Sequence, residues 1–425
     1  MHSTWARTLS QVIWAATGVL LPAMGFAQSS SLASRDASGW SFCPSVALGY
    51  DTFGQTYTIS DTDTLDLVDE LSGRLVTSLR YRGARSFELK NSFGLGEEAT
   101  RNDLRALLRL PWESFELRWT HDVHYRGYRS TSEYNLSSDY LTNISRLTGI
   151  WKLTPDWRLR LDERFEHSDF AARTRYNYDY WRTDTGAEIE RRWGLLSSLR
   201  TGYTYGTRSV RDSTEIDFER HIGSAGLYQT FGMHSLQFQN YAERRTYRDA
   251  SVRSAYIDYQ GTLTGSVSLA DDVRLRPTYI GRVTAYDRPD SVYSDATEQV
   301  TELMLEKDLN ARATLGIGPR GEFRRTQSEF DRPYNQYGVK GSISYLTGSL
   351  WMQFTNEFGM RSYFAGSDFI YSDYVFNWST LYLSYSFRQL MAFDLYFSLS
   401  PESHDDSADN MTTILVSSAL TWKLR

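Results

Sequence analysis

The stretch DLRALLRLPWESFELRWTHDVHYR, residues 103–126, holds two alternating segments on either side of a short turn at Pro111-Trp112-Glu113. In the first segment apolar residues occupy the even positions and polar residues the odd ones, with Leu107 as the exception. In the second, the odd positions from Phe115 to Tyr125 are mostly apolar and the even positions are polar or charged. Successive side chains of a strand point to opposite faces, so a period of two predicts β-strands. The stretch therefore predicts a hairpin with one apolar and one polar face.

Tight turns of this kind recur about 40 residues apart along most of the chain. They are Pro111-Trp112-Glu113, Thr154-Pro155-Asp156, Arg192-Trp193, Gly232-Met233, Ala270-Asp271-Asp272, Leu309-Asn310, Thr347-Gly348-Ser349 and Gln389-Leu390. Each repeat holds two alternating segments and a longer loop. From Trp40 onward this cadence predicts ten hairpins, hence about 20 strands, with 18 as the alternative count. The first hairpin pairs 42–51 with 72–82 and leaves Thr52–Leu71 as the longest loop.

The fold class this predicts is all-β: a transmembrane, antiparallel, up-and-down β-barrel without a plug domain. A soluble sandwich or propeller shows the same alternation. Its strands are usually five or six residues long, however, and the segments of this chain are longer. Composition also favours the membrane barrel, because aromatic residues make up 15% of the chain, with 29 Tyr, while hydrophobic residues total only 40%. Only alternate residues of such a strand meet lipid, and Tyr and Trp collect at both interfaces.

The N-terminus predicts export from the cytoplasm. Arg7 precedes an apolar stretch, Val12–Met24, and Gly25-Phe26-Ala27 offers small residues for cleavage before Gln28. No later stretch is apolar enough for a membrane-spanning helix. The expected organisation is a signal peptide at 1–27, a short periplasmic tail at 28–39 and the barrel at 40–425, located in the bacterial outer membrane.

The last strand resembles the assembly signal at the C-terminus of bacterial outer-membrane barrels. Ser417, Ala419, Trp422 and Leu424 match its polar, small and two apolar positions, although Ala replaces the usual Gly and Arg425 follows the usual end. As a whole, the chain is similar to porin-like outer-membrane barrels, including porins associated with exopolysaccharide export. The resemblance implies partners in outer-membrane lipid, lipopolysaccharide and the barrel-assembly machinery, with periplasmic export or uptake components as a further possibility.

The polar face of the predicted strands supplies the candidate site, a pore wall rich in arginine. By parity its main members are Arg74, Arg80, Arg105, Arg118, Arg126, Arg158, Arg160, Arg164, Arg274, Arg276, Arg324, Glu116, Asp122 and Asp162. The same parity adds Arg82, Arg109, Arg312, Arg320, Asp103, Glu166 and Glu322, with Trp351, Tyr382 and Tyr396 as surfaces for sugar rings. Rings of arginine favour anions in pores. The wall therefore indicates a channel for anionic or saccharide solutes.

Other interpretations of this wall stay open. The charges can pair across strands and merely satisfy a polar surface. The barrel can instead be an export pore for a secreted exopolysaccharide, or a sheath around a partner protein. A barrel this wide needs a constriction, and the loop Thr52–Leu71 is the segment long enough to fold inward.

Enzymatic and nucleic-acid functions are disfavoured. No histidine lies in an H-E-x-x-H motif, and no G-x-S-x-G motif is present. Cys43 is the only cysteine, which excludes a haem-attachment motif, and no cofactor is expected. The formal net charge of −6 disfavours nucleic acid as a partner. Acidic loops bearing Asp61, Asp290 and Asp406 admit a role in cation or lipopolysaccharide bridging, but no complete ligand spacing such as D-x-D-x-D-G is present, which favours ordinary solvated loops.

Overall fold

The computed structural model describes residues 39–59, 62–96, 99–128, 139–172, 178–194, 196–211, 213–290, 293–326, 332–364, 372–387, 390–405 and 409–424. The expected signal peptide and all of the tail except its last residue, Gly39, lie outside these ranges, as do Asp61 and Asp406. Among the residues that the structure describes, no helix has the length and apolar content needed to cross a membrane.

Twenty strands make up the described chain. They are β1 (Gly39–Ile59), β2 (Thr62–Arg82), β3 (Ser86–Gly96), β4 (Ala99–Pro111), β5 (Phe115–Tyr128), β6 (Tyr140–Lys152), β7 (Trp157–Phe170), β8 (Tyr180–Trp193), β9 (Ser197–Val210), β10 (Phe218–Phe231), β11 (His234–Tyr247), β12 (Tyr256–Ala270), β13 (Val273–Tyr286), β14 (Ala296–Asn310), β15 (Ala313–Thr326), β16 (Tyr334–Leu346), β17 (Leu350–Tyr363), β18 (Tyr374–Phe387), β19 (Met391–His404) and β20 (Met411–Lys423).

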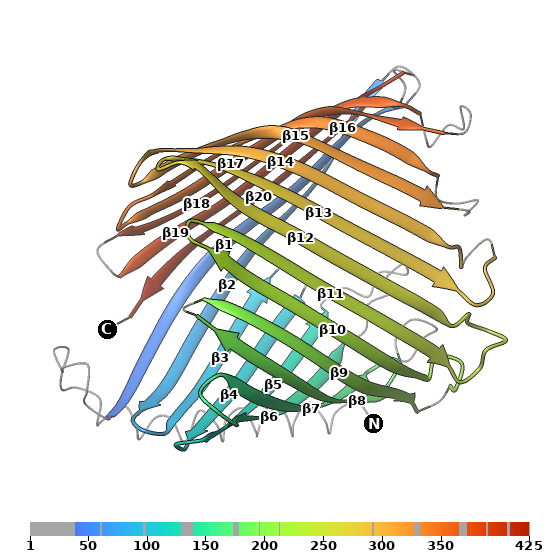
Figure 1. Cartoon of the computed structure of the whole chain (residues 1–425). Coiled ribbons are helices and arrows are strands. Elements are labelled where there is room, and N and C mark those ends of the chain that lie inside the picture. Colours follow the sequence, from blue (N-terminus) through green and yellow to red (C-terminus); the bar gives the residue numbers. More distant parts are fainter. Residues whose placement is uncertain are drawn as a thin grey trace.

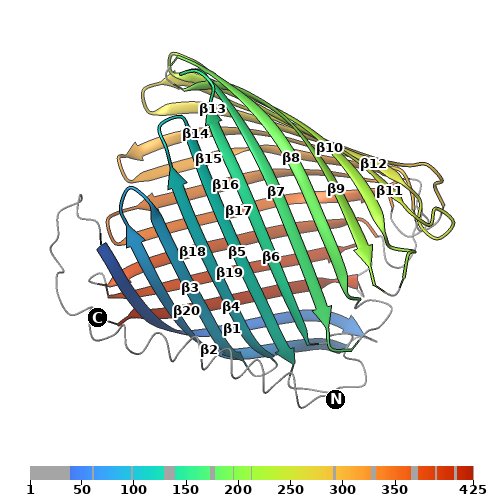
Figure 2. The ribbon, with the colours of Figure 1, turned by 90° about the horizontal axis from the view of Figure 1, so that it is seen from below.

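These strands form one closed antiparallel sheet. Each strand pairs with its neighbours in sequence, and β1 also pairs with β20, from Ser45 opposite Lys423 to Tyr57 opposite Met411. The ribbon accordingly curves into a cylinder of tilted strands in which the first and last strands lie side by side (Figures 1 and 2). All the strands of the described residues belong to this wall. The predicted all-β, up-and-down barrel of about 20 strands is confirmed.

Every strand has an inward and an outward face, and the register aligns these faces from strand to strand. Arg220 of β10 reaches Asp184 of β8 at 2.7 Å, and Arg320 of β15 reaches Glu357 of β17 at 2.7 Å. In both contacts the side chains meet across an intervening strand. Such contacts form on the concave side of a curved sheet, so these four residues face inward. The most fully buried large side chain, Phe376, shares this inward face. The outward face carries exposed apolar residues, as the 59% exposure of Leu48 illustrates.

The first hairpin differs from its prediction. Backbone pairing between β1 and β2 continues to Ile59 opposite Thr62, so Thr52–Leu71 is not an infolded loop but an extension of both strands. The segment Tyr57-Thr58-Ile59 has strong β-propensity, and β1 also pairs there with β20. The proposed constriction by this loop is therefore wrong.

The tight turns lie close to their predicted positions. Gly232 has φ of 61°, a left-handed conformation that glycine adopts without strain in a two-residue hairpin turn. Two predicted turns, Arg192-Trp193 and Leu309-Asn310, instead form the ends of β8 and β14. Arg312 consequently lies in the β14–β15 turn and not on the inward wall, because a register shift follows Asp308.

The cylinder is wide. With neighbouring strands about 4.8 Å apart and tilted by about 45°, a ring of twenty strands has a backbone radius of roughly 22 Å. Inward side chains alone do not fill a cylinder of this width. The inward wall is therefore a surface that solvent or another molecule can reach.

Candidate functional site

The inward wall unites the predicted pore residues. Register places the following on this one face: Arg74, Arg80, Arg82, Arg105, Arg109, Arg118, Arg126, Arg158, Arg160, Arg164, Arg274, Arg276, Arg320, Arg324, Asp103, Glu116, Asp122, Asp162, Glu166 and Glu322. Their part in a pore stays a prediction. What the structure adds is the set of contacts between them.

Most of these arginines are paired across or along strands. The pairs are Arg80–Glu88 at 3.0 Å, Arg105–Asp122 at 3.4 Å, Arg109–Glu116 at 2.8 Å, Arg118–Glu116, Arg160–Asp162 at 2.6 Å, Arg164–Glu166 at 2.5 Å, Arg274–Asp308 at 2.9 Å, Arg276–Glu306 at 3.1 Å, Arg320–Glu322 at 2.9 Å and Arg324–Glu298 at 3.6 Å. Arg74, Arg82, Arg126 and Arg158 make no ion pair with any described residue. Ion pairs thus neutralise most of the inward arginines and leave these four guanidiniums without an ion-pair partner.

Strands β8 to β12 hold a buried network that the sequence did not reveal. Arg220 joins Asp184 at 2.7 Å and Glu243 at 3.8 Å, and all three side chains are at most 12% exposed. Glu243 also accepts hydrogen bonds from Arg245, at 2.7 Å, and from Tyr256, at 3.3 Å. One carboxylate therefore holds two arginines in place.

This network depends on a residue without a side chain. Gly206 of β9 lies between Asp184 and Arg220, and a Cβ there would be 2.1 Å from Asp184 Oδ1 and 2.8 Å from Arg220 Nε. Only glycine lets the two charged groups meet across β9. A single strand gives no sign of this contact, since it depends on the register of three strands.

A second network lies on β15 to β17. The Arg361 guanidinium donates to Gln336 Oε1 at 2.6 Å and stacks over the Tyr334 ring at 4.1 Å. Gln336 in turn donates to Glu357 at 3.2 Å, and Arg320 donates to the same carboxylate at 2.7 Å. Gln336 and Glu357 thus link two arginines from different strands.

Basic residues predominate on the inward wall. Along the twenty strands, the arginine and lysine residues that face inward outnumber the aspartate and glutamate residues there. The whole chain nevertheless has a net charge of −6. Its acidic surplus must therefore lie outside this wall.

The three predicted aromatic residues also face inward. Trp351 and Tyr382 rings lie 4.6 Å apart between centroids, and Tyr396 is opposite Tyr382 in register. Trp351 is 44% exposed and Tyr396 is 36% exposed. The wall thus presents open aromatic surface among polar neighbours.

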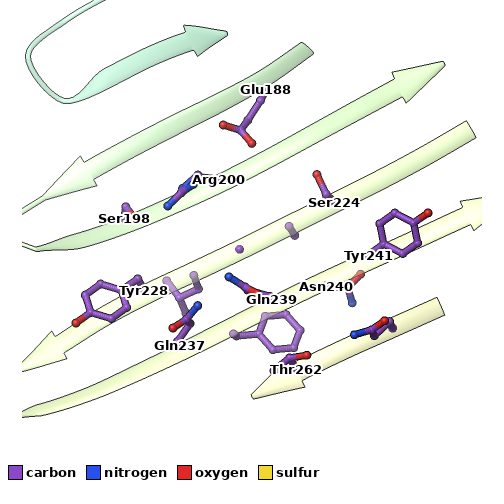
Figure 3. A pocket seen from close by; sticks show the side chains of 15 residues that line it. Glu188, Ser198, Arg200, Ser224, Tyr228, Gln237, Gln239, Asn240, Tyr241 and Thr262 are labelled. Atoms are coloured by element: carbon purple, nitrogen blue, oxygen red, sulfur yellow. The ribbon is translucent and has the colours of Figure 1, made fainter. Parts of the chain in front are cut away.

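A recess interrupts the wall between β8 and β12. Its volume is about 340 Å³, and Figure 3 shows side chains from five strands around it. Six of them are polar residues that face inward: Glu188, Arg200, Ser224, Tyr228, Gln237 and Gln239. None was singled out from the sequence. The signal that could have found them is the pair of small inward residues on β10, Ser224 and Gly226, which leaves a hollow.

Loop-end carboxylates are stabilised as anions. Asp287, just beyond β13, accepts a hydrogen bond from Arg244 Nη1 at 2.6 Å, which holds the pKa of this carboxyl below its usual value. The Ser251 hydroxyl lowers the pKa of Asp249 in the same way. Within the described ranges, no group of three His, Cys, Asp or Glu side chains is arranged to hold a metal ion.

The residues of the expected assembly signal lie on or next to β20. Ser417 and Ala419 face inward, whereas Trp422 faces outward and is 55% exposed. Leu424 follows the strand, and its backbone N–H donates to Pro44 O at 2.9 Å. Recognition of this segment by the assembly machinery stays a prediction.

Comparisons with known proteins show the fold. No protein-family model matches the sequence, and no curated protein matches it. Among solved structures, the siderophore receptor PirA from Pseudomonas aeruginosa is 11% identical with a TM-score of 0.54, over 92% of this chain and 81% of that one. The alcaligin outer-membrane receptor FauA from Bordetella pertussis is 10% identical with a TM-score of 0.51, over 92% and 77%. OpdQ from Pseudomonas aeruginosa is 11% identical with a TM-score of 0.48, over 90% and 98%. The chain has the fold of the outer-membrane β-barrels.

Proposed function

We propose that this protein is a channel of the bacterial outer membrane that passes anionic or saccharide solutes along its inward wall. One observation carries the proposal: the strands direct apolar side chains outward and polar ones inward, and the inward set has a surplus of basic residues. An apolar exterior suits hydrocarbon, and a basic interior suits anions.

Strand length and aromatic placement support a membrane location. A strand of 14 residues, such as β5, rises about 3.3 Å per residue and covers roughly 33 Å along the axis at a tilt of about 45°. That span matches the hydrocarbon thickness of a bilayer. Outward aromatic residues lie near both ends of the strands, with Trp157 near one end of β7 and Trp181 near the other end of β8. Such girdles mark the two interfaces of outer-membrane barrels.

The free guanidiniums support anion preference. Arg74, Arg126 and Arg158 face inward without an ion-pair partner among the described residues, so each contributes positive potential to the lumen. The exposed rings of Trp351 and Tyr396 supply flat apolar surface that sugar rings can contact. Together these groups favour anionic and saccharide solutes over cations.

Single-channel recording tests the proposal. The refolded protein, inserted in a planar bilayer under a KCl gradient, is expected to conduct with a reversal potential that favours chloride. Neutralising Arg74, Arg126 and Arg158 together to Gln should move this potential toward potassium. Arg191→Gln is the matched control, because Arg191 faces outward and stacks over Trp157 at 5.5 Å. Cation selectivity, or a barrel that never conducts, would contradict the proposal.

A further inference from the structure

The recess in the inward wall exists because β10 carries no large side chain at its centre. Gly202 of β9 and Gly226 of β10 both face inward, and Gly226 is opposite Arg200 on one side and Gln239 on the other. The neighbouring inward residue on β10, Ser224, is small. Figure 3 shows the side chains that line the recess on both sides of β10, from Ser224 to Tyr228.

Three polar side chains at this recess have no hydrogen-bond partner among the described residues. Within the described residues, the side-chain amides of Gln237 and Gln239 and the carboxylate of Glu188 make no hydrogen bond and no ion pair. Both glutamines are exposed. Elsewhere on the wall, polar side chains such as Gln336 and Glu357 bond to each other. A set of unused donors and acceptors around a hollow is typical of a ligand site.

The local charges indicate which ligand fits. Arg200 has a side-chain exposure of 58% and reaches Glu190 only at 3.6 Å, so its guanidinium can donate to a ligand. Glu188 of β8 is opposite Gly202 of β9 in register and offers a carboxylate. A simple anion would gain from the first group and be repelled by the second. Sugar hydroxyls both donate and accept, so they use the guanidinium, the carboxylate and the two amides at once.

We infer that this recess is a saccharide-binding site, in which Arg200, Glu188, Gln237 and Gln239 bind ring hydroxyls and the Tyr228 ring contacts the sugar face. The inference rests on the proposed channel function and narrows its solute class to saccharides. Its position on the inward wall places the bound sugar on the path through the barrel.

A filling substitution tests the site directly. A Cβ at Gly226 would meet only Phe238 O, at 3.8 Å, so Gly226→Trp can project into the recess without a backbone clash. Gly94→Trp is the matched control, since Gly94 faces inward on β3 and its nearest atom is also 3.8 Å away. Binding of maltohexaose and of hexagalacturonate to the detergent-refolded barrel is measured by isothermal titration calorimetry.

The expected result is that maltohexaose binds the wild-type barrel and the Gly94→Trp variant alike, and that Gly226→Trp weakens binding by about tenfold or more. Gln239→Ala removes one hydrogen-bonding amide without adding bulk, and it should weaken binding by about fivefold. No saccharide binding, binding of hexagalacturonate alone, or equal binding by all variants would overturn the inference.

The two proposals fail separately. A barrel that conducts anions but binds no maltohexaose retains the channel function and loses the saccharide site. A barrel that binds maltohexaose in a Gly226-dependent manner but carries no current retains the site and loses the channel function.

Discussion

Replacing Glu243 by Gln should destabilise the barrel through the arginines it holds. Glu243 is 5% exposed and bonds to Arg245 at 2.7 Å, to Tyr256 at 3.3 Å and to Tyr241, with Arg220 at 3.8 Å. Gln keeps the shape of the side chain but removes its charge. The side-chain NH2 group of the Gln would also place an N–H donor next to groups that themselves donate hydrogen bonds to Glu243.

The expected magnitude follows from burial. Removing one partner from a buried ion pair leaves a charge without compensation, which costs about 3 kcal/mol. An exposed pair behaves differently, because water screens it and its contribution stays below about 1 kcal/mol. Arg80–Glu88 is such a pair, at 3.0 Å with side-chain exposures of 38% and 32%. Glu88→Gln is therefore the matched control for the same chemical change.

Equilibrium urea unfolding in phosphatidylcholine vesicles measures both variants. The account predicts that Glu243→Gln loses about 3 kcal/mol of unfolding free energy and Glu88→Gln less than about 1 kcal/mol. Equal losses in the two variants would show that burial does not determine the cost of removing the carboxylate.

Five further substitutions, two of them matched controls, test the two faces and the strand packing with the same unfolding measurement. Val339→Arg puts a charge on the outward face near the middle of β16 and should cost about 2–4 kcal/mol in lipid, whereas Ser342→Arg on the inward face should cost far less; similar values would contradict the assigned faces. Glu163 is an exposed carboxylate on the outward face of β7, so Glu163→Leu should stabilise the barrel by about 1 kcal/mol, and a loss of stability would show that this carboxylate is not in lipid. A Cβ at Gly318 would lie 1.8 Å from a carbonyl oxygen of β14, so Gly318→Ala should cost about 2 kcal/mol or more, while Gly341→Ala, with open space, should be near neutral; a tolerated Gly318→Ala would refute the close approach.

The barrel could be predicted because the sequence pattern of each strand can be recognised on its own. Alternation from Phe115 to Tyr125 identifies β5 without reference to any other strand, and Pro155 and Gly232 mark turns by their own backbone preferences. The first hairpin was predicted too short because the residues around Asp61 are polar on both sides of the turn. Composition there indicates a loop, whereas pairing with β20 extends the strand.

The contacts of the inward wall could not be predicted in the same way. Parity places Arg160 and Asp162 on one face, but it does not say which neighbour across the sheet each residue meets. The Asp184–Arg220 contact requires Gly206 to stand between them, and that depends on the register of three strands. A one-residue change of register would reverse every face, so such contacts are visible only in the assembled sheet.

Spin-label accessibility along β12 tests whether hydrocarbon covers one face of each strand and water the other. In a Cys43→Ser background, single nitroxide labels at 260–265 in vesicle-inserted protein report collisions with lipid-soluble oxygen and with a water-soluble nickel chelate. The account predicts a period of two, with oxygen favoured at the outward Leu263 and the chelate at the inward Thr262 and Thr264. Equal accessibility at all positions, or the reversed pattern, would contradict it.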